Sequence, residues 1–354
     1  GSKLISTVEG LSQSKVTSIV QDDQGFIWFG TQYGLNRYDG YKFKLFKHEP
    51  GRPDSLSGVY VTYILKDRNG QLWVANDGFL DRFDPMTETC THYFFDSKKP
   101  HDPGNRIVRI SQDRNGLLWL ATLNGLRRLD PASGKITEYR HDPRDPTSLS
   151  SSSVFFSGED RRGTFWVTTQ EGLDRFDRDT GKVTLHVPLS EPTTLTFYED
   201  SRGVFWLVHS TGTGLAVFDR DTARLTRYSF HEREPERTTQ SGVLAMIEDK
   251  AGNLWLGTPS DGLLKFERDH NRFVRYRNHP SKPGSLVDNH VIALFEDRES
   301  NIWLGLQEMG VNYLSTRKPL FERFMHEPGN PNSLDRTLVG AIYEDREGIL
   351  WVGT

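Results

Sequence analysis

Residues 22–31 read DDQGFIWFGT, and this stretch recurs seven more times along the chain. The later copies are DRNGQLWVAN at 67–76, DRNGLLWLAT at 113–122, DRRGTFWVTT at 160–169, DSRGVFWLVH at 200–209, DKAGNLWLGT at 249–258, DRESNIWLGL at 297–306 and DREGILWVGT at 345–354. Together the copies contain all 8 tryptophans of the chain. Recurrence at roughly 40–50 residues is typical of one supersecondary unit repeated many times.

Each repeat holds four short runs of apolar, β-branched and aromatic residues, separated by turn residues. In the first repeat these runs are 16–20, 27–31, 34–38 and 43–46, and such runs predict strands. The Asp-x-x-Gly segment predicts a tight hairpin, in which the carboxylate accepts backbone N–H groups and the Gly takes a positive φ. We expect the Trp that follows to pack between neighbouring sheets. Four antiparallel strands at this spacing indicate a β-propeller blade.

The fold class predicted from the repeats is all-β, a seven-bladed propeller of four-stranded antiparallel blades. The first strands are expected to begin near Val16, Val61, Ile107, Val154, Thr194, Val243 and Val291. Within residues 1–15 we expect an expression scar and an outer strand, Leu4–Thr7, that completes the last blade. We assign residues 16–330 to seven repeats and 331–354 to the first half of an eighth. That half repeat either starts a second propeller or closes an eight-bladed ring, and the chain is expected to be part of a longer protein.

The composition excludes several classes of protein. The 354 residues are 35% hydrophobic and 26% charged with a net charge of -4, which gives no electrostatic footprint for nucleic acid. No apolar run is long enough to span a membrane. The single Cys90 excludes an internal disulfide framework and a multi-cysteine metal site, and it is expected to be a half-buried structural residue. We expect neither a cofactor nor a metal.

The string V-x-x-I-x-x-D-x-x-G-x-I-W-x-G-T-x-x-G-L-x-R-x-D resembles the two-component regulator propeller repeat, over residues 16–354. The resemblance implies the extracytoplasmic sensor part of a hybrid histidine kinase or a related membrane-bound signalling protein. It further implies a periplasmic location, a membrane segment outside this chain and a homodimeric receptor. A kinase or diguanylate cyclase would be the output, and a small molecule or oligosaccharide the ligand.

Residues that recur in every repeat are expected to hold the scaffold. Arginines and aspartates alternate in the third strands, and we expect them to form salt bridges between blades: Arg37, Arg82, Arg128 and Arg175 with Asp39, Asp84, Asp130 and Asp177. Histidines that precede a proline, namely His48, His141, His279 and His326, are expected to be structural turn residues.

Function is therefore expected where the repeats differ, around the mouth of the central channel. Candidates in the loops between second and third strands are Tyr33, Asn76, Asp77, Phe79, Glu171 and His209. Loops that lead into the first strands, called lead-in loops here, supply Tyr60, Arg106 and His290. One position of the first strand is small in most repeats but holds Tyr63, Arg109 and Phe156 in three consecutive ones. These three large side chains in neighbouring repeats predict the wall of an off-centre pocket.

The family resemblance implies a non-catalytic, ligand-sensing ectodomain that binds at the channel mouth, and the composition and the lack of a catalytic motif agree with it. One alternative is a propeller scaffold that docks another protein. A glycan lyase or hydrolase is the other alternative, and it requires either two close carboxylates or a Tyr or His base with an Arg, on the face that carries the varied loops. The candidates for those roles are Asp77, Arg106, Glu171 and His209.

Overall fold

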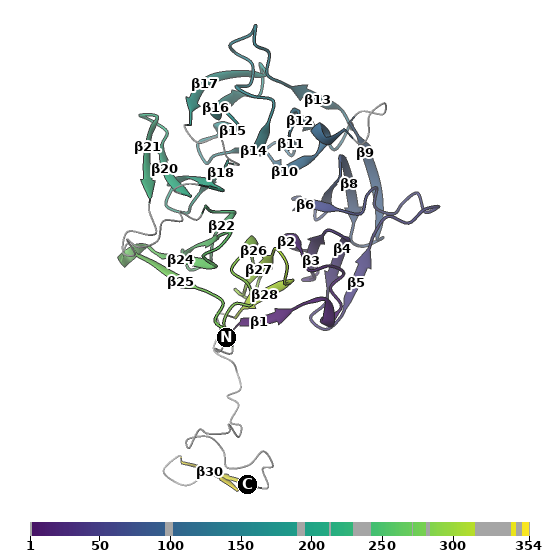
Figure 1. The fold of residues 1–354 in the computed structure, drawn as a ribbon. Helices are drawn as coiled ribbons and strands as arrows, with labels where there is room; N and C mark the ends of the chain where they lie inside the picture. Colours follow the sequence, from purple (N-terminus) through teal and green to yellow (C-terminus); the bar gives the residue numbers. More distant parts are fainter. Residues whose placement is uncertain are drawn as a thin grey trace. The chain divides into compact units, whose positions relative to one another are not determined.

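A computed structural model describes residues 2–95, 102–189, 195–211, 214–228, 242–270, 272–280, 284–315, 341–344 and 349–353. Seven antiparallel sheets of four strands each follow one another around a ring (Figure 1). The protein is thus an all-β, seven-bladed propeller, and the eight-bladed alternative is wrong. Within the described residues the ring also contains three short 3-10 helices, η1 (Thr7–Glu9), η2 (Pro103–Asn105) and η3 (Arg268–His270).

The strands of blades 1 to 4 follow one another in sequence, from the channel outwards. Blade 1 contains β2 (Val16–Gln21), β3 (Ile27–Thr31), β4 (Gly34–Tyr38) and β5 (Phe43–Phe46). Blade 2 contains β6 (Val61–Lys66), β7 (Leu72–Asn76), β8 (Phe79–Asp84) and β9 (Thr89–Phe94). Blade 3 contains β10 (Ile107–Gln112), β11 (Leu118–Thr122), β12 (Gly125–Leu129) and β13 (Ile136–Tyr139). Blade 4 contains β14 (Val154–Glu159), β15 (Phe165–Thr169), β16 (Gly172–Asp177) and β17 (Lys182–Pro188).

Blades 5 and 6 repeat this order, and blade 7 does not. Blade 5 contains β18 (Leu195–Glu199), β19 (Phe205–His209), β20 (Leu215–Asp219) and β21 (Arg224–Tyr228). Blade 6 contains β22 (Ala245–Glu248), β23 (Leu254–Gly257), β24 (Leu263–Glu267) and β25 (Arg272–Tyr276). Blade 7 contains β26 (Val291–Glu296), β27 (Ile302–Leu306) and β28 (Val311–Leu314), and its outermost strand is β1 (Ser2–Ile5).

The N-terminal strand therefore joins the two ends of the ring. β1 runs antiparallel to β28, with Ser2 opposite Leu314 and Ile5 opposite Val311. It ends at Ile5, two residues before the predicted end, because Ser6 caps η1 by accepting the N–H of Val8. Residues 317–354 form a second compact unit, in which β29 (Ala341–Glu344) pairs with β30 (Leu350–Gly353). The assignment of 331–354 to a further repeat stays a prediction.

The Asp-x-x-Gly turn and the Trp that follows it form one hydrogen-bonded unit, called the Asp–Trp turn here. In blade 1 one oxygen of Asp22 accepts the N–H groups of Gln24 and Phe26, and the other accepts Trp28 Nε1 at 2.7 Å. The Asp–Trp bond recurs in all seven blades at 2.7–2.9 Å. This arrangement confirms the predicted carboxylate-capped hairpin. The buried indole N–H, which is costly to leave unpaired, is satisfied within six residues of its own sequence.

The indole rings join neighbouring blades, as predicted. Trp28 is fully buried in a cluster with Val61, Ile64 and Phe83 of blade 2, and its ring lies 5.3 Å from that of Phe83. Equivalent clusters lie between the later blades. Trp303 of blade 7 packs against Phe29 of blade 1 at 5.8 Å, which closes the apolar contact around the ring.

The salt bridges predicted for the alternating arginines and aspartates of the third strands are found for Arg37 alone within the described residues, and its partner is Glu88 of blade 2, at 3.0 Å, not an aspartate of the third-strand signature. These aspartates cap turns by accepting backbone N–H groups, as Asp39 does from Tyr41 and Lys42. Their arginine neighbours lie over the Trp rings in three blades, with Arg37 5.7 Å, Arg82 6.0 Å and Arg128 5.8 Å from the ring centre. A short aspartate already fixed in its own turn is not free to pair with the neighbouring blade.

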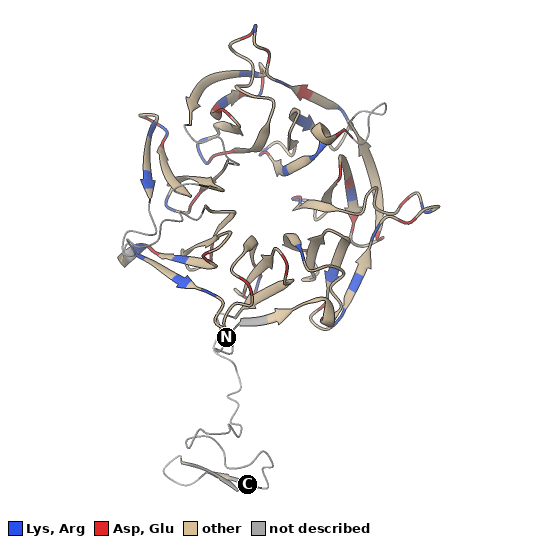
Figure 2. Ribbon diagram, viewed as in Figure 1, with Lys and Arg blue, Asp and Glu red and all other residues tan. Residues whose placement is uncertain are grey.

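In blades 4, 5 and 6 the arginine directly after the third strand forms further ion pairs between blades. Arg220 contacts the turn aspartate of blade 4, Asp160, at 2.9 Å and Glu199 of blade 5 at 2.8 Å. Arg178 bridges Asp113 and Glu159 in the same way, and Arg268 bridges Asp200 and Glu248. Charged residues lie in every blade of the ribbon (Figure 2). The position of charge alone therefore does not distinguish these three arginines from the other charged residues.

Candidate functional site

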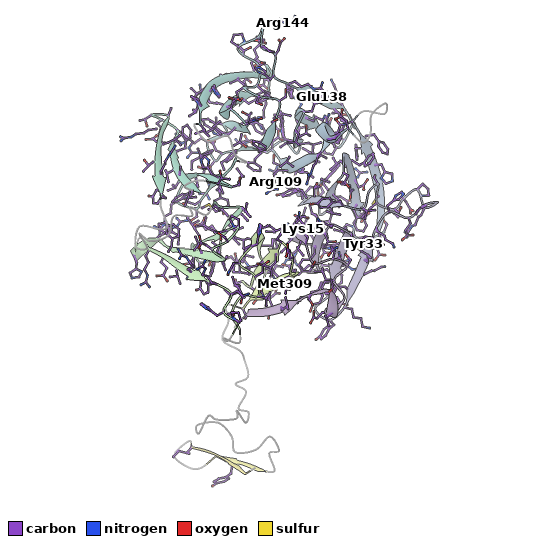
Figure 3. All side chains as sticks on the ribbon, in the orientation of Figure 1. Lys15, Tyr33, Arg109, Glu138, Arg144 and Met309 are labelled. Atoms are coloured by element: carbon purple, nitrogen blue, oxygen red, sulfur yellow. The ribbon has the colours of Figure 1, made fainter. Side chains whose placement is uncertain are left out.

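Two cavities lie along the axis of the ring. The first, of about 650 Å³, is lined by the inner strands near the Asp–Trp turns. The second, of about 520 Å³, is lined by lead-in loops and inner strands at the opposite mouth. Both share Thr17, Arg109, Thr196, Val208, Leu244 and Ile292, so they are the two ends of one channel. Lys15 and Arg109 lie beside the central opening, and Arg144 lies on the outer rim (Figure 3).

The lead-in loops and the loops between second and third strands lie on the same face, as predicted. In blade 1 the N–H of Gly34 donates to the carbonyl of Val59 in the next lead-in loop, at 2.7 Å. Gly125 donates to Ser152 and Gly310 to Ser14 in the same manner. We call this side the variable face and the side with the Asp–Trp turns the turn face.

Buried polar side chains of the third strands hold the lead-in loops. Asp81 accepts the N–H of Ser57 at 2.7 Å, and Asp174 accepts that of Ser150 at 2.9 Å. In blades 1 and 7 the amide oxygens of Asn36 and Asn312 do the same for Ser12 and Val287. These side chains are fully buried. The sequence reasoning missed them, although each stands two residues after the glycine of the third-strand signature or its Phe79 counterpart.

A β-bulge at the start of the first strand decides which side chains reach the channel. The register shifts between Val61 and Tyr63, and likewise in blades 1, 3, 4 and 7. One extra residue reverses the alternation of faces, so Val61 and Ile64 both enter the core. Tyr60 and Tyr63, also three apart, both line the channel. The lead-in position and the variable first-strand position are thus one channel-facing set.

At the variable-face mouth, side chains from three consecutive blades meet. Lys15 leads into blade 1, Tyr60 into blade 2 and Arg106 into blade 3. Both cations lie near the Tyr60 ring, with Lys15 Nζ 5.7 Å and the Arg106 guanidinium carbon 5.6 Å from its centre. Ser210 of blade 5 and Gln307 of blade 7, the neighbour of blade 1, also line the mouth.

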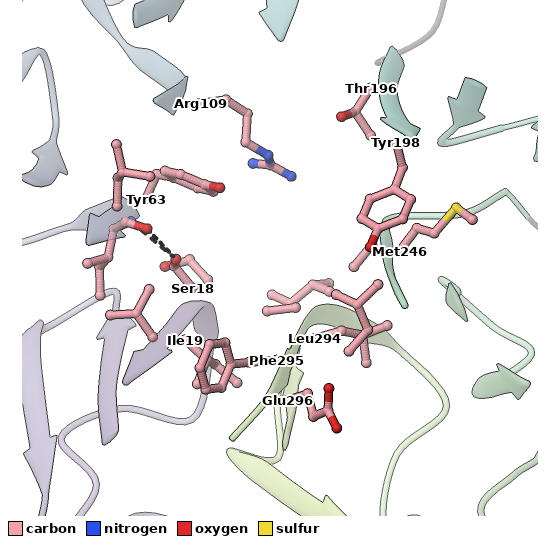
Figure 4. Close-up of a pocket in the computed structure, with 18 of the residues that line it drawn as sticks. Ser18, Ile19, Tyr63, Arg109, Thr196, Tyr198, Met246, Leu294, Phe295 and Glu296 are labelled. Carbon is pink, nitrogen blue, oxygen red and sulfur yellow. Dashed lines mark hydrogen bonds between the residues drawn. The ribbon is translucent and has the colours of Figure 1, made fainter. Parts of the chain in front are cut away.

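A second cation and aromatic ring lie one layer deeper. The Arg109 guanidinium is 5.1 Å from the centre of the Tyr63 ring and donates to the carbonyl of Val108 at 3.0 Å. Both side chains project into the channel, facing Tyr198 and Met246 across it (Figure 4). Phe156 completes this wall and packs edge-on against Phe197 at 4.8 Å. The predicted wall of three large residues therefore exists in blades 2 to 4.

At the turn-face mouth the charged side chains are paired. Lys66 contacts Asp23 at 2.6 Å, and Arg298 lies 3.8 Å from the same carboxylate. Lys250 donates to the carbonyls of Asp297 and Arg298. Glu296 accepts the backbone N–H of Lys250 at 2.9 Å. These charges connect neighbouring blades, and each has a partner in the scaffold.

Five of the twelve candidate residues line the channel, and seven do not. The five are Tyr60, Tyr63, Arg106, Arg109 and Phe156. The seven are Tyr33, Asn76, Asp77, Phe79, Glu171, His209 and His290. Most of the loops between second and third strands lie farther from the axis, because those strands are the second and third from it. Leu123, Ser210 and Gln307 are the described residues of such loops that line the cavities.

Contacts within the scaffold explain why several of these seven candidate residues do not line the channel. Asn76 is fully buried and donates to Asp81 at 2.8 Å. Phe79 lies in β8 and packs against Phe94 at 5.6 Å, and the positive φ expected at its position is found one residue earlier, at Gly78. His209 ends β19 and is buried. Tyr33 is 42% exposed beside Lys47, whose Nζ donates to its hydroxyl.

The proposed acid and base candidates do not meet in the structure. Of Asp77, Glu171, His209 and Arg106, only Arg106 lines the channel. Among the described residues, the variable-face cavity has no Asp, Glu or His in its lining. No group of three His, Cys, Asp or Glu suited to a metal is found in that same part of the chain.

Cysteine and histidine have structural surroundings. Cys90 is half-buried among the apolar residues around Trp28, and burial raises the pKa of its thiol. His48 and His141 each contact a carbonyl of the next lead-in loop, Leu56 and Leu149, at 2.8 and 2.7 Å. In blade 6 the residue before His279, Asn278, makes the corresponding contact to Val287. His326 lies outside the described residues.

Like His186, which lies 2.7 Å from Asp174, His92 contacts a carboxylate that holds a lead-in loop. Its Nδ1 lies 2.7 Å from Asp81 Oδ1 and its Nε2 2.6 Å from the carbonyl of Pro53. The hydrogen bond to the Asp81 carboxylate raises the pKa of His92 above its ordinary value. Protonation of His92 is therefore coupled to the lead-in loop of blade 2.

Comparison with known sequences gives a family for the repeats. A family model described as two component regulator propeller matches residues 10–33, 55–78, 101–124, 239–260 and 333–354. A curated protein named histidine kinase P4, from Formosa agariphila, is 44% identical over 55 residues, which is 16% of this chain and 4% of that protein.

Solved structures with the same fold include two from B. thetaiotaomicron. One is described as the extracellular domain of a hybrid two component system, BT3049, and is 26% identical with a TM-score of 0.77. Another, from BT4673, is 21% identical with a TM-score of 0.72. Each is matched over 100% of this chain, which spans 46% and 51% of their lengths. A streptogramin B lyase, 16% identical over 88% of this chain and 96% of that one with a TM-score of 0.67, shares the propeller fold.

Proposed function

Because the chain carries the repeats of the two-component regulator propeller family, we propose that it is the ligand-sensing part of a membrane-bound signalling receptor. The similar solved domains are extracellular, which suggests a location outside the cytoplasm for this chain too. No helix in the described residues has the length and apolar character of a membrane span. The membrane segment and the kinase or cyclase output belong, in this proposal, to parts of the receptor outside the chain.

The observation that carries the proposal is the channel lining. Blades 2 to 4 place Tyr63, Arg109 and Phe156 at one position, where blades 1, 5, 6 and 7 have Ser or Thr or Ala. A wall of two aromatic rings and a cation supplies stacking surface and directed hydrogen bonds, which are what a polar ring-shaped ligand needs. Small molecules and oligosaccharides meet this description. The site needs no catalytic group for such a role.

Signal transmission requires a ligand that prefers one receptor state over another. A ligand shifts an equilibrium only by its difference in affinity for the two states. The lead-in loops line the channel and are bonded to the hairpins of the preceding blade, so a bound ligand can change the shape of the variable face. We propose that this change alters how two receptor chains pack in a homodimer.

Thermal unfolding in the presence of an oligosaccharide and metabolite library tests the proposal. A binder should raise the unfolding midpoint of the chain by mass action, and Tyr63→Ala or Arg109→Ala should remove that shift. Tyr41→Ala serves as the control, since this ring is 91% exposed and does not line the channel.

Three results would contradict the sensor proposal. A shift that survives both channel variants puts the binding site elsewhere. Conversion of a library compound into product favours the glycan lyase or hydrolase alternative. A library without any binder, together with a protein partner that competes for the variable face, favours the docking alternative.

A further inference from the structure

The variable-face mouth gathers positive charge without a carboxylate to balance it. Lys15, Arg106 and Arg109 line this cavity, and Asp and Glu are absent from its lining within the described residues. None of the three cations makes an ion pair with another part of the chain that the structure describes. The whole chain has a net charge of -4, so the local excess does not follow from composition.

The arginines at three blade boundaries show, by contrast, how this fold pairs arginine with carboxylates. Arg178, Arg220 and Arg268 each contact two carboxylates of neighbouring blades. The cations of the variable-face mouth instead lie against Tyr60 and Tyr63. Like charges held together repel one another, and a bound anion relieves that repulsion. The arrangement therefore favours an anionic occupant.

The cations are arranged asymmetrically around the mouth. Lys15, Arg106 and Arg109 come from blades 1 and 3, and the rings of Tyr60 and Tyr63 come from blade 2 between them. Blades 5 to 7 line the mouth with apolar and neutral polar residues, namely Thr196, Val208, Ser210, Val243, Leu244, Ile292 and Gln307. A ligand with an acidic group on one side and a less polar body matches both halves of the wall.

On these grounds we infer that the channel binds an acidic saccharide, with its carboxylate or sulfate group between Lys15, Arg106 and Arg109. This inference rests on the proposed sensor function and narrows its ligand class. Arginine binds planar carboxylate and tetrahedral oxyanions through paired N–H donors, and lysine adds a point charge. Tyr60 and Tyr63 provide faces for the sugar ring beside the charged group.

Titration calorimetry of the whole chain with two panels of oligosaccharides tests the inference. The acidic panel contains oligogalacturonates, which carry only carboxylates, and neutral-backbone carrageenan fragments, which carry only sulfates. The neutral panel contains galactan, xylan and starch fragments of the same lengths. We expect binding from the acidic panel, about tenfold weaker when salt rises from about 20 to 200 mM. The two acidic arms show which oxyanion the site prefers.

Variants place the binding at the predicted side chains. Arg106→Gln and Lys15→Gln should each weaken acidic binders at least about tenfold, because a hydrogen bond to a charged group is lost. Arg144→Gln is the matched control: its side chain is 91% exposed and lies on the outer rim (Figure 3). It should leave the affinity unchanged. The unfolding midpoint of each variant without ligand shows that it is folded.

The results separate this inference from the function on which it rests. Neutral oligosaccharides that bind alone, and lose binding in Tyr63→Ala, overturn the acidic-ligand inference and leave the sensor proposal standing. Acidic binding that is insensitive to salt or to Arg106→Gln also overturns it. So does the absence of heat from every acidic fragment, in which case the metabolite library still tests the sensor proposal independently.

Discussion

The two faces of the ring use the same kinds of residue for different ends. On the turn face, seven aspartates cap seven turns in the same way, and Arg178, Arg220 and Arg268 each neutralise two carboxylates across a blade boundary. On the variable face, Arg106 and Arg109 lie over tyrosines in the channel. Arg82 and Arg128 also lie over aromatic rings, but away from the channel. The difference teaches that a place in the channel together with the lack of a carboxylate partner, and not residue type, marks an arginine as a candidate for ligand binding.

Removing the carboxylate of an Asp–Trp turn should have the largest effect on stability. Asp160 accepts Trp166 Nε1 and two backbone N–H groups and also pairs with Arg220. Asp160→Ala removes one of the two carboxylates that Arg220 contacts and leaves a buried indole N–H unpaired, and we expect it to lower the free energy of unfolding by about 3–5 kcal/mol. Urea unfolding followed by Trp fluorescence measures the loss.

Asp22→Ala is the matched comparison for that variant. Asp22 makes the same turn contacts through its side chain, but its carboxylate has no ion pair with an arginine in the described structure. We expect a smaller loss of about 1–3 kcal/mol, from the unpaired donors alone. Equal losses in the two variants would show that the ion pair with Arg220 contributes nothing.

Replacing a paired and an unpaired arginine compares the two faces directly. Arg220→Gln leaves Asp160 and Glu199 without their cation, and the arginine side chain is only 7% exposed. We expect a loss of about 2–3 kcal/mol in the free energy of unfolding. Arg106→Gln on the variable face should change it by less than about 0.5 kcal/mol. A comparable loss in both would mean that Arg106 belongs to the scaffold.

One irregular turn should become more stable when it is made like the others. Ser300 occupies the place of the turn glycine in blade 7 and has φ 65°, a left-handed conformation that disfavours a Cβ. Ser300→Gly should raise the free energy of unfolding by about 1 kcal/mol, measured by urea unfolding. Ser300→Ala keeps the Cβ and should give no gain. A gain from alanine as large as that from glycine would point to the hydroxyl rather than to the backbone.

The smallest expected effect is a pH dependence of the free energy of unfolding, and it comes from His92 beside the lead-in loop of blade 2. The pKa of His92 is raised in the folded chain by its bond to Asp81, so its contribution to stability is complete below the unfolded pKa of about 6.5. The contribution is lost as the pH rises through the higher folded value. The free energy of unfolding should therefore fall by less than about 1 kcal/mol between mildly acidic and alkaline pH.

His92→Gln should flatten that part of the pH profile. His141→Gln is a suitable control, because His141 contacts the carbonyl of Leu149 and has no carboxylate partner among the described residues. An unchanged slope in His92→Gln would show that other groups produce the pH dependence. The measurement is urea unfolding at a series of pH values with constant ionic strength.

The repeated part of the structure could be predicted from the sequence because its bonds are local. The turn aspartate and the indole that it binds are six residues apart, as Asp22 and Trp28 are, so the motif contains both partners. The regular spacing of the motif then predicts one sheet for each repeat, and a series of such sheets predicts the propeller. The closing strand is also sequence-encoded, although its end at Ile5 depends on the cap at Ser6.

What the tertiary structure alone decided is which side chains meet across blades. Strict alternation puts Tyr60 and Tyr63 on opposite sides of a strand, and the bulge before Tyr63 brings both to the channel. One of the two carboxylate partners of Arg220, Asp160, lies 60 residues away in the chain, so the local sequence could not identify it. Asn76 and Phe79 look variable in sequence and are held by the scaffold. The blades can be predicted from the sequence because their hydrogen bonds join residues that are close in the chain. The channel wall cannot, because its contacts exist only when the ring has closed.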